Sequence, residues 1–237
     1  MENIAGIVQA ICVGKPQAFL RPGTHSAILK TAVTTPVRVG FNGLDGDAQA
    51  DQRLHGGRDK AVHIYPWEHY AQWLPFFSHP SARLISHGAF GENLSTTGLT
   101  ELTVCIGDIW SIGSVMLEVT QPRQPCWKVN DRFGVPDLAW QMQQHKKTGF
   151  YCRVLQAGVI AAGEPITLIQ RPYPEWPLQR MLALLYHHPL DQDELNSALR
   201  LPLVTKWQAM FERRLETATV EDWRARLAGP KSYEHAV

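Results

Sequence analysis

The strongest constraint on this fold is an abrupt change in the spacing of apolar residues near residue 171. Before it, short apolar segments rich in β-branched and aromatic residues are separated by glycine, aspartate and proline, a pattern typical of a β-barrel or β-sandwich. After residue 177 the apolar residues recur with the period of a helix, about 3.6 residues. Three prolines lie within residues 171–177 and disfavour both a helix and a central strand. We therefore place a domain boundary there.

The first part is expected to form a barrel with two helical inserts. The predicted strands cover residues 4–13, 37–41, 61–65, 102–105, 109–112, 115–120, 150–155 and 166–169. Gly113 and Ser114 separate two of these strands and predict a hairpin turn. The inserts are expected at 67–77, where Pro66 would begin the first turn, and at 137–145, where Asp137 would cap the helix.

The second part is expected to be a small helical bundle, with helices at 178–186, 190–199, 204–215 and 220–227. Asp191 followed by Glu194 resembles a capping box, and Thr219 with Asp222 is a second start signal. The predicted class is therefore mainly β (α+β), with a barrel-like domain at 1–172 and a helical domain at 173–237.

Composition and charge exclude several classes of function. Lysine and arginine total 23 against 22 acidic residues, a net charge of +1 that gives no reason to expect nucleic acid or an anionic membrane as a partner. No run approaches the roughly 18 apolar residues of a membrane span, and the N-terminus lacks the pattern of a secretory signal. The four cysteines are far apart, with no CxxC pair to indicate zinc or disulfides. We expect a cytoplasmic protein.

One cysteine has unusual neighbours. Cys12, Cys105 and Cys152 lie in apolar segments, where cysteine usually behaves as a small hydrophobic residue. Cys126 instead follows a predicted strand in a proline-stiffened loop, with Arg123 and Lys128 close by. Nearby cations favour a thiolate, which could attack a substrate, carry sulfur or ligate a soft metal. The alternative is an ordinary loop cysteine between solvated charges.

Several segments carry a family resemblance. GDIWSIGSVMLEVTQPRQPCWKV at 107–129 looks like the cysteine-bearing signature of the MOSC family, which is named after the C-terminal domain of molybdenum cofactor sulfurases. Segments 43–70 and 88–101 agree in the right order, as do KPQAFLRPGTHSAILK at 15–30 and GFYCRVLQAG at 149–158. The helical tail is similar to the three-helix extension of the YiiM subgroup. The resemblance covers nearly the whole chain.

The resemblance implies a β-barrel-like domain followed by a C-terminal three-helix domain. It also implies that the cysteine of the barrel domain ligates molybdenum or carries a persulfide. For the YiiM subgroup it implies reduction of N-hydroxylated compounds such as 6-N-hydroxylaminopurine. The chain has no GxGxxG motif and no cysteine in its tail, so it should hold neither a flavin nor an iron–sulfur cluster. Electrons must then come from an external flavin or iron–sulfur protein. Pyridoxal phosphate is not expected, because the sulfurase domain that uses it is missing. A homodimer is left open.

A molybdopterin presents a phosphate, a polar pterin and a dithiolene, so its host needs cations, exposed backbone amides and one soft ligand. We expect Cys126 to be the metal ligand and catalytic residue. The expected cofactor-binding residues are Lys15, Lys30, Arg53, His55, Gly56, Gly57, Asn93, Arg123 and Arg153.

Simpler roles compete with some of these assignments. The His-Gly-Gly segment also fits a tight turn, and Asn93 could hold its own loop instead of a pterin. Glu92 could be structural, and Asp47 and Asp51 could orient cations or cap turns.

Three functions are compatible with this set: a molybdenum-dependent reductase of N-hydroxylated substrates, which we favour, a persulfide carrier, and a non-catalytic cofactor-binding module. For the reductase, cations on the tail helices could dock an acidic redox partner. These are Lys206, Arg213, Arg214, Arg224 and Arg226.

Overall fold

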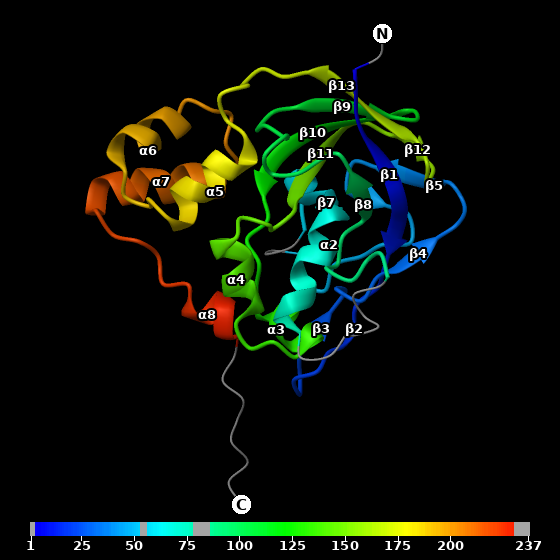
Figure 1. Ribbon diagram of the computed structural model, residues 1–237, viewed down its shortest axis with the longest axis horizontal. Helices are drawn as coiled ribbons and strands as arrows, with labels where there is room; N and C mark the ends of the chain where they lie inside the picture. The colour runs from blue at the N-terminus through cyan, green and yellow to red at the C-terminus, as the bar shows by residue number, and fades with distance from the viewer. Residues whose placement is uncertain (1–2, 53–55, 78–85, 230–237) are drawn as a thin grey trace, which may run out of the picture.

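The computed structural model describes residues 3–52, 56–77 and 86–229. Its main sheet has eight strands: β1 (Ile4–Val13), β4 (Thr31–Val33), β7 (Val62–Pro66), β8 (Leu94–Thr97), β9 (Ile109–Ile112), β10 (Val115–Pro122), β11 (Phe150–Gln156) and β13 (Pro165–Gln170). Seven of them run in the order β13-β9-β10-β11-β7-β8-β1, and β1 pairs back with β13 to close a barrel (Figure 1). All of these pairings are antiparallel except that of β7 with β8. The expected mainly β, barrel-like fold is confirmed.

Shorter strands extend the barrel at its rim. β5 (Val37–Gly40) pairs with β6 (Gly43–Leu44) and β12 (Gly158–Ile160), and β2 (Gln17–Ala18) pairs with β3 (His25–Ser26). The predicted hairpin is confirmed, because β9 and β10 pair across Gly113 and Ser114. The strand predicted at 102–105 is wrong: the backbone amides of Thr103 and Val104 both bond to Thr100 O, which makes a turn.

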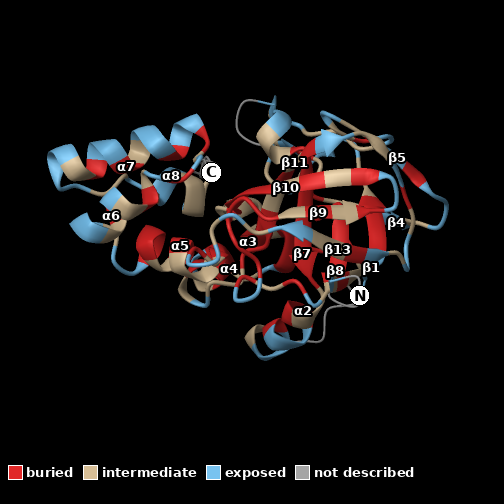
Figure 2. Cartoon of the chain, turned by 90° about the horizontal axis from the view of Figure 1, so that it is seen from above, coloured by how far each residue is buried: buried red, intermediate tan, exposed pale blue. Residues whose placement is uncertain are grey.

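The barrel interior follows the alternation of its strands. Along β10 the buried apolar residues are Val115, Leu117 and Val119, and the side chains between them are less buried. Trp110 and Phe150 meet edge to face with ring centroids 5.9 Å apart. Figure 2 shows this buried interior in red. Cys152 is fully buried within it and Cys12 is fully buried elsewhere in the fold, which confirms their packing role. Burial raises the pKa of Cys12 to about 12.

Three helices cover one side of the barrel around a second apolar cluster. They are α2 (Glu68–Trp73), which continues as the 3₁₀ turn η2 (Leu74–Phe76), α3 (Trp127–Phe133) and α4 (Leu138–Gln144). The cluster includes Tyr65 of β7, Phe90, and Phe133 of α3. The inserts predicted at 67–77 and 137–145 correspond to α2 and α4, whereas α3 was not expected. Asp137 makes no capping bond to the α4 backbone.

The tail begins with three helices, α5 (Leu178–Tyr186), α6 (Gln192–Ala198) and α7 (Thr205–Thr217), and ends in the short α8 (Arg224–Ala228). The predicted cap of α6 is confirmed, since Asp191 Oδ1 accepts a hydrogen bond of 3.0 Å from Glu194 N. Trp176, Trp207 and Phe211 belong to the same buried cluster as the barrel interior. The hydrophobic core therefore continues across the predicted boundary, and the division into two domains stays a prediction.

Along the described chain, no helix combines the length and the apolar character needed to cross a lipid bilayer.

Candidate functional site

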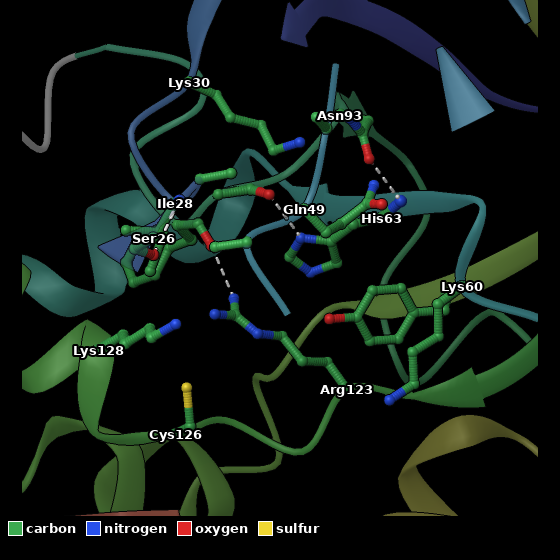
Figure 3. A pocket seen from close by; sticks show the side chains of 16 residues that line it. Ser26, Ile28, Lys30, Gln49, Lys60, His63, Asn93, Arg123, Cys126 and Lys128 are labelled. Carbon is green, nitrogen blue, oxygen red and sulfur yellow. Dashed lines mark hydrogen bonds between the residues drawn. The ribbon is translucent and has the colours of Figure 1, made fainter. Parts of the chain in front are cut away.

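A pocket opens on the outer side of the barrel, beside Cys126 (Figure 3). It contains about 590 Å³ of space, part of it open to solvent. The residues that line it are Ser26, Ala27, Ile28, Lys30, Ala48, Gln49, Ala50, Lys60, His63, Phe90, Gly91, Asn93, Arg123, Cys126, Lys128 and Tyr151. Of the expected site residues, the structure therefore brings together Cys126, Lys30, Asn93 and Arg123.

The end of β10 and the start of α3 determine where Cys126 lies. β10 ends at Pro122, and Cys126 has extended backbone angles, φ −128° and ψ 168°, immediately before the first turn of α3. Its thiol points into the pocket between Lys128 and Arg123 (Figure 3). Cys126 is half-buried, whereas the other three cysteines are buried. It is therefore the cysteine that a ligand in this pocket can reach.

Arg123 is the most buried cation of the pocket, with 6% of its surface exposed. Its Nη1 donates a hydrogen bond of 2.8 Å to the carbonyl oxygen of Phe90. Among the described residues no carboxylate forms an ion pair with it. A buried guanidinium usually has an anionic partner, because removing its charge from water is costly. Arg123 is thus a candidate anion-binding residue.

The charge around the pocket is one-sided. Lys30, Lys60, Arg123 and Lys128 line it, and no aspartate or glutamate is found among its described lining residues. Burial, followed by repulsion from Lys206, lowers the pKa of Lys60 to about 8. Burial also lowers the pKa of Lys30, although its Nζ forms an ion pair of 2.5 Å with Asp47 Oδ1 just outside the pocket. Such a surface favours an anionic ligand.

Two aromatic rings form the opposite wall. His63 of β7 and Tyr151 of β11 are cross-strand partners, and their ring centroids lie 4.9 Å apart. His63 Nδ1 lies 3.1 Å from Gly91 O. Since a carbonyl can only accept, Nδ1 carries the hydrogen and Nε2 has the lone pair of the neutral ring. His63 and Tyr151 were not expected at the site, and the pairing of β7 with β11 is what brings them together. Lys128 was expected only as a cation close to Cys126.

The loop that carries Phe90 and Gly91 is fixed from behind by Glu92. This carboxylate is fully buried and accepts hydrogen bonds from Gly88 N at 2.7 Å, from Phe90 N at 3.1 Å and from the Tyr70 hydroxyl. Burial raises the pKa of Glu92. Its contacts are thus structural, and they orient the carbonyl groups that Arg123 and His63 use.

Asn93 is also occupied within the protein. Its Oδ1 accepts from His63 N at 3.0 Å, and its Nδ2 donates to Asp47 Oδ2 at 2.9 Å and to Cys12 O at 3.3 Å. Of the two roles considered for Asn93, these bonds favour holding its own loop over reading a pterin. Asp47 also binds Lys30, which favours the cation-orienting role considered for it over the turn-capping one.

The remaining expected residues do not line this pocket. Lys15 is exposed beyond the end of β1, and Arg153 forms an ion pair of 3.0 Å with Asp59. Gly56 packs against its own chain, because a Cβ there would lie 2.8 Å from Gln52 O. Gly57 has φ 97° and leads into the 3₁₀ turn η1 (Arg58–Lys60). Cofactor-binding roles for these four stay predictions. Arg53 and His55 lie outside the described residues.

A bare metal ion would lack ligands here. Within the described residues no group of three or more histidine, cysteine, aspartate or glutamate side chains is arranged to hold a metal. Cys126 could supply one soft ligand, and any metal bound to it would have to bring its other ligands with it.

Two family models and several known proteins match this chain. A model of the MOSC domain matches residues 51–167, and one of the YiiM-like, 3-alpha helix domain matches residues 176–218. Protein YiiM of Escherichia coli (strain K12) is 38% identical over 220 residues, which cover 92% of this chain and 97% of that protein.

Two further comparisons concern structure and activity. The crystal structure of YiiM from Escherichia coli superposes with a TM-score of 0.79 at 32% identity, covering 94% of this chain and 99% of that one. A protein named Reductase from Gibberella moniliformis (strain M3125 / FGSC 7600) is 36% identical over 194 residues. These cover 81% of this chain but 34% of that longer protein.

Proposed function

The chain belongs to the MOSC family and, within it, to the YiiM-like proteins, and from this premise we propose that it is a molybdenum-cofactor-dependent oxidoreductase in which Cys126 ligates the metal. MOSC domains in general are associated with the molybdenum cofactor, and the relative named Reductase gives a precedent for redox activity. The cofactor, the substrate and the role of each residue are our proposal.

The observation that carries the proposal is the pocket itself, which has four cations and no described carboxylate in its lining. Arg123 is buried there and has no acidic partner among the described residues. A pterin phosphate would offset that positive charge and give Arg123 an anionic acceptor. Lys60 and Lys128 come from different segments, so together with Arg123 they could contact a phosphate from several directions. A neutral ligand would leave Arg123 without an anionic acceptor among the described residues.

Cys126 suits molybdenum for two reasons. A thiolate is a soft ligand, which is the type that a thiophilic metal prefers. Because the described residues offer no cluster of three ligands, the metal would need a carrier with donors of its own, and a dithiolene supplies two sulfurs. The residues present therefore fit a cofactor that arrives with its metal better than they fit a free ion.

When bound, the cofactor would supply the electron pair for the redox step. Reduction of an N-hydroxyl group to an amine breaks the N–O bond, consumes two electrons and two protons, and releases water. In this chain, Arg123 and Lys128 would hold the cofactor anion. Lys60 Nζ, with a pKa lowered to about 8, could release a proton near neutral pH, and His63 with Tyr151 would limit the size of the substrate.

The electrons would come from a separate flavin or iron–sulfur protein in the cytoplasm. The docking surface suggested by the tail cations loses support, because most of them are already engaged. Arg214 is buried and bound to Glu221, Arg213 also contacts Glu221, Arg224 pairs with Asp222, and Arg226 bonds to Pro125 O. We therefore assign the donor no binding site on this chain.

Metal and pterin analysis of protein produced in a molybdenum-replete host tests the proposal. We expect molybdenum and pterin in equal amounts, approaching one of each per chain, and loss of both in Cys126→Ser. A persulfide carrier would instead contain sulfane sulfur on Cys126 without molybdenum. A non-catalytic module would contain pterin and show no reductase activity towards N-hydroxylated compounds with a chemical reductant. Either result would reject the proposed function.

A further inference from the structure

The last helix of the described chain returns to the site. An extended segment leads from α7 to α8, which lies beside α3 and α4 (Figure 1). α3 is the helix that begins directly after Cys126. The chain thus brings a segment about a hundred residues distant in sequence to the loop that carries the thiol.

Four consecutive residues of this segment contact the surroundings of Cys126. Arg226 Nη1 donates a hydrogen bond of 2.5 Å to the carbonyl oxygen of Pro125, the residue before Cys126. Its Nη2 donates to Gln143 Oε1 at 3.2 Å, which connects the same side chain to α4. Arg226 therefore joins the loop of the thiol to a neighbouring helix.

The next three residues extend the contact to α3 and to Arg21. Leu227 O accepts a hydrogen bond of 2.9 Å from Asn130 Nδ2, and Ala228 O accepts one of 2.7 Å from Arg21 Nη1. Gly229 lies directly against the ring of Trp127, since a Cβ at that position would be 2.6 Å from Trp127 Cγ. Trp127 is the residue after Cys126, so contacts with this segment flank the thiol on both sides.

The segment is also fixed at its other end. Glu221 accepts hydrogen bonds from Arg214, at 2.7 Å from its Nη2, and forms an ion pair of 3.1 Å with Arg213. The ring of Trp223 meets that of Tyr186 in α5 edge to face at 5.3 Å. The segment 221–229 is thus held by the helical tail at one end and by the Cys126 region at the other.

α3 needs such support. It has seven residues, and the side chain of Cys126, its N-cap residue, makes no capping hydrogen bond. A helix this short is not stable alone in water, so tertiary contacts must determine where it begins and where Cys126 points. We propose that α8 is a strap that positions Cys126, with Arg226 as its main positioning residue. By ordering the thiol in advance, the strap lowers the entropy cost of binding a ligand to Sγ.

The test measures how fast each cysteine of the full-length protein reacts with iodoacetamide, by mass spectrometry of its peptides. The protein is produced in molybdate-depleted medium, so that Cys126 carries no metal whatever its function. Arg226→Ala is compared with Arg224→Ala, which removes an arginine from the same helix that pairs only with its neighbour Asp222 among described groups. Arg226→Lys tests whether one donor to Pro125 O is enough.

In Arg226→Ala we expect Cys126 to react about tenfold faster, the scale set by losing a hydrogen bond from a charged donor. The plateau rate at high pH should rise too, because access to the thiol and not only its ionisation changes. Buried Cys12 and Cys152 should keep their parent rates. Arg224→Ala should match the parent at all four cysteines, and Arg226→Lys should stay close to the parent rate at Cys126.

Two results would overturn the assignment. An unchanged Cys126 rate in Arg226→Ala would mean that the strap does not position the thiol. Parallel increases at Cys12, Cys126 and Cys152 would mean that Arg226 stabilises the whole fold and nothing more specific. If Arg226→Ala does not fold, Arg226→Gln, which keeps the length of the stem and removes the charge, is judged by the same comparison. Neither result depends on whether the protein binds molybdenum, so this test can fail independently of the proposed function.

Discussion

Arg123 donates a hydrogen bond of 2.8 Å to the carbonyl oxygen of Phe90 and so joins the loop of Cys126 to the loop that Glu92 holds in place. Phe90 stacks on Tyr65 with ring centroids 4.4 Å apart, which fixes that carbonyl against the barrel. One edge of the guanidinium is therefore anchored, and its remaining donors are available to a ligand.

Arg123→Ala should weaken pterin binding by about 10-fold to 100-fold, the range expected for removing a charge-assisted hydrogen bond to a phosphate or polar ring. The measurement is pterin content per chain, or the dissociation constant for inorganic phosphate where the cofactor is lost. Arg153→Ala is the matched control, because Arg153 pairs with Asp59 and lies outside the pocket. Equal losses in both variants would show that the pocket does not bind the anion.

Cys126→Ser should lose molybdenum and reductase activity while its free energy of unfolding changes little, because the half-buried thiol contributes few core contacts. Cys152→Ala should do the reverse, costing roughly 1–2 kcal/mol of stability with unchanged activity per folded molecule. Urea unfolding and metal analysis of the two variants separate these effects. A Cys126→Ser protein that keeps molybdenum would remove the thiolate from the site.

The sequence predicted the elements of the barrel well where apolar and polar residues alternate clearly. It predicted them less well where contacts between distant segments determine the secondary structure. β1, β9 and α5 have the predicted bounds because their patterns are long or bounded by turns. α3 was missed because its seven residues include valine, asparagine and aspartate, which favour helix weakly, and because contacts from α8 support it. β8 was missed because Ser95, Thr96 and Thr97 are polar and do not indicate a buried strand in the sequence. Pairing with β7 is what establishes the strand.

The site was predicted in part for a related reason. Cys126 and Arg123 lie in one loop, so local sequence was enough to group them. Arg153 follows two residues after Tyr151 on β11, but η1 lies over this part of the strand and supplies Asp59 as its partner. His63 and Tyr151 are 88 positions apart and meet only through strand pairing, which no single-sequence pattern specifies.

Lys60 should make stability depend on pH above neutral. Its folded-state pKa is lowered from 10.5 to about 8, so between these values the unfolded chain binds more protons. The free energy of unfolding should therefore be highest above pH 10.5, where Lys60 is neutral in both states, and should fall as the pH is lowered to about 8. Lys60→Gln should gain stability relative to the parent as the pH is lowered across this window, while losing affinity for anions. Urea unfolding at several pH values checks this, with the exposed Lys15→Gln as control. A gain that does not vary with pH would contradict it.

Phe211→Ala tests whether the tail is an independent domain. Phe211 of α7 is fully buried in the cluster that also contains Val119 and Phe150 of the barrel. Truncating Phe211 should lower the free energy of unfolding by about 3–5 kcal/mol. Because the core is continuous, the barrel should be destabilised together with the tail. In urea, the helical signal in circular dichroism and the labelling of Cys152, which reacts only when the barrel opens, should shift together in Phe211→Ala. Glu216→Ala, exposed on the same helix, should shift neither. If the helical signal moves while Cys152 labelling stays at the parent midpoint, residues 173–237 unfold on their own, and the boundary drawn from the prolines is a true domain boundary.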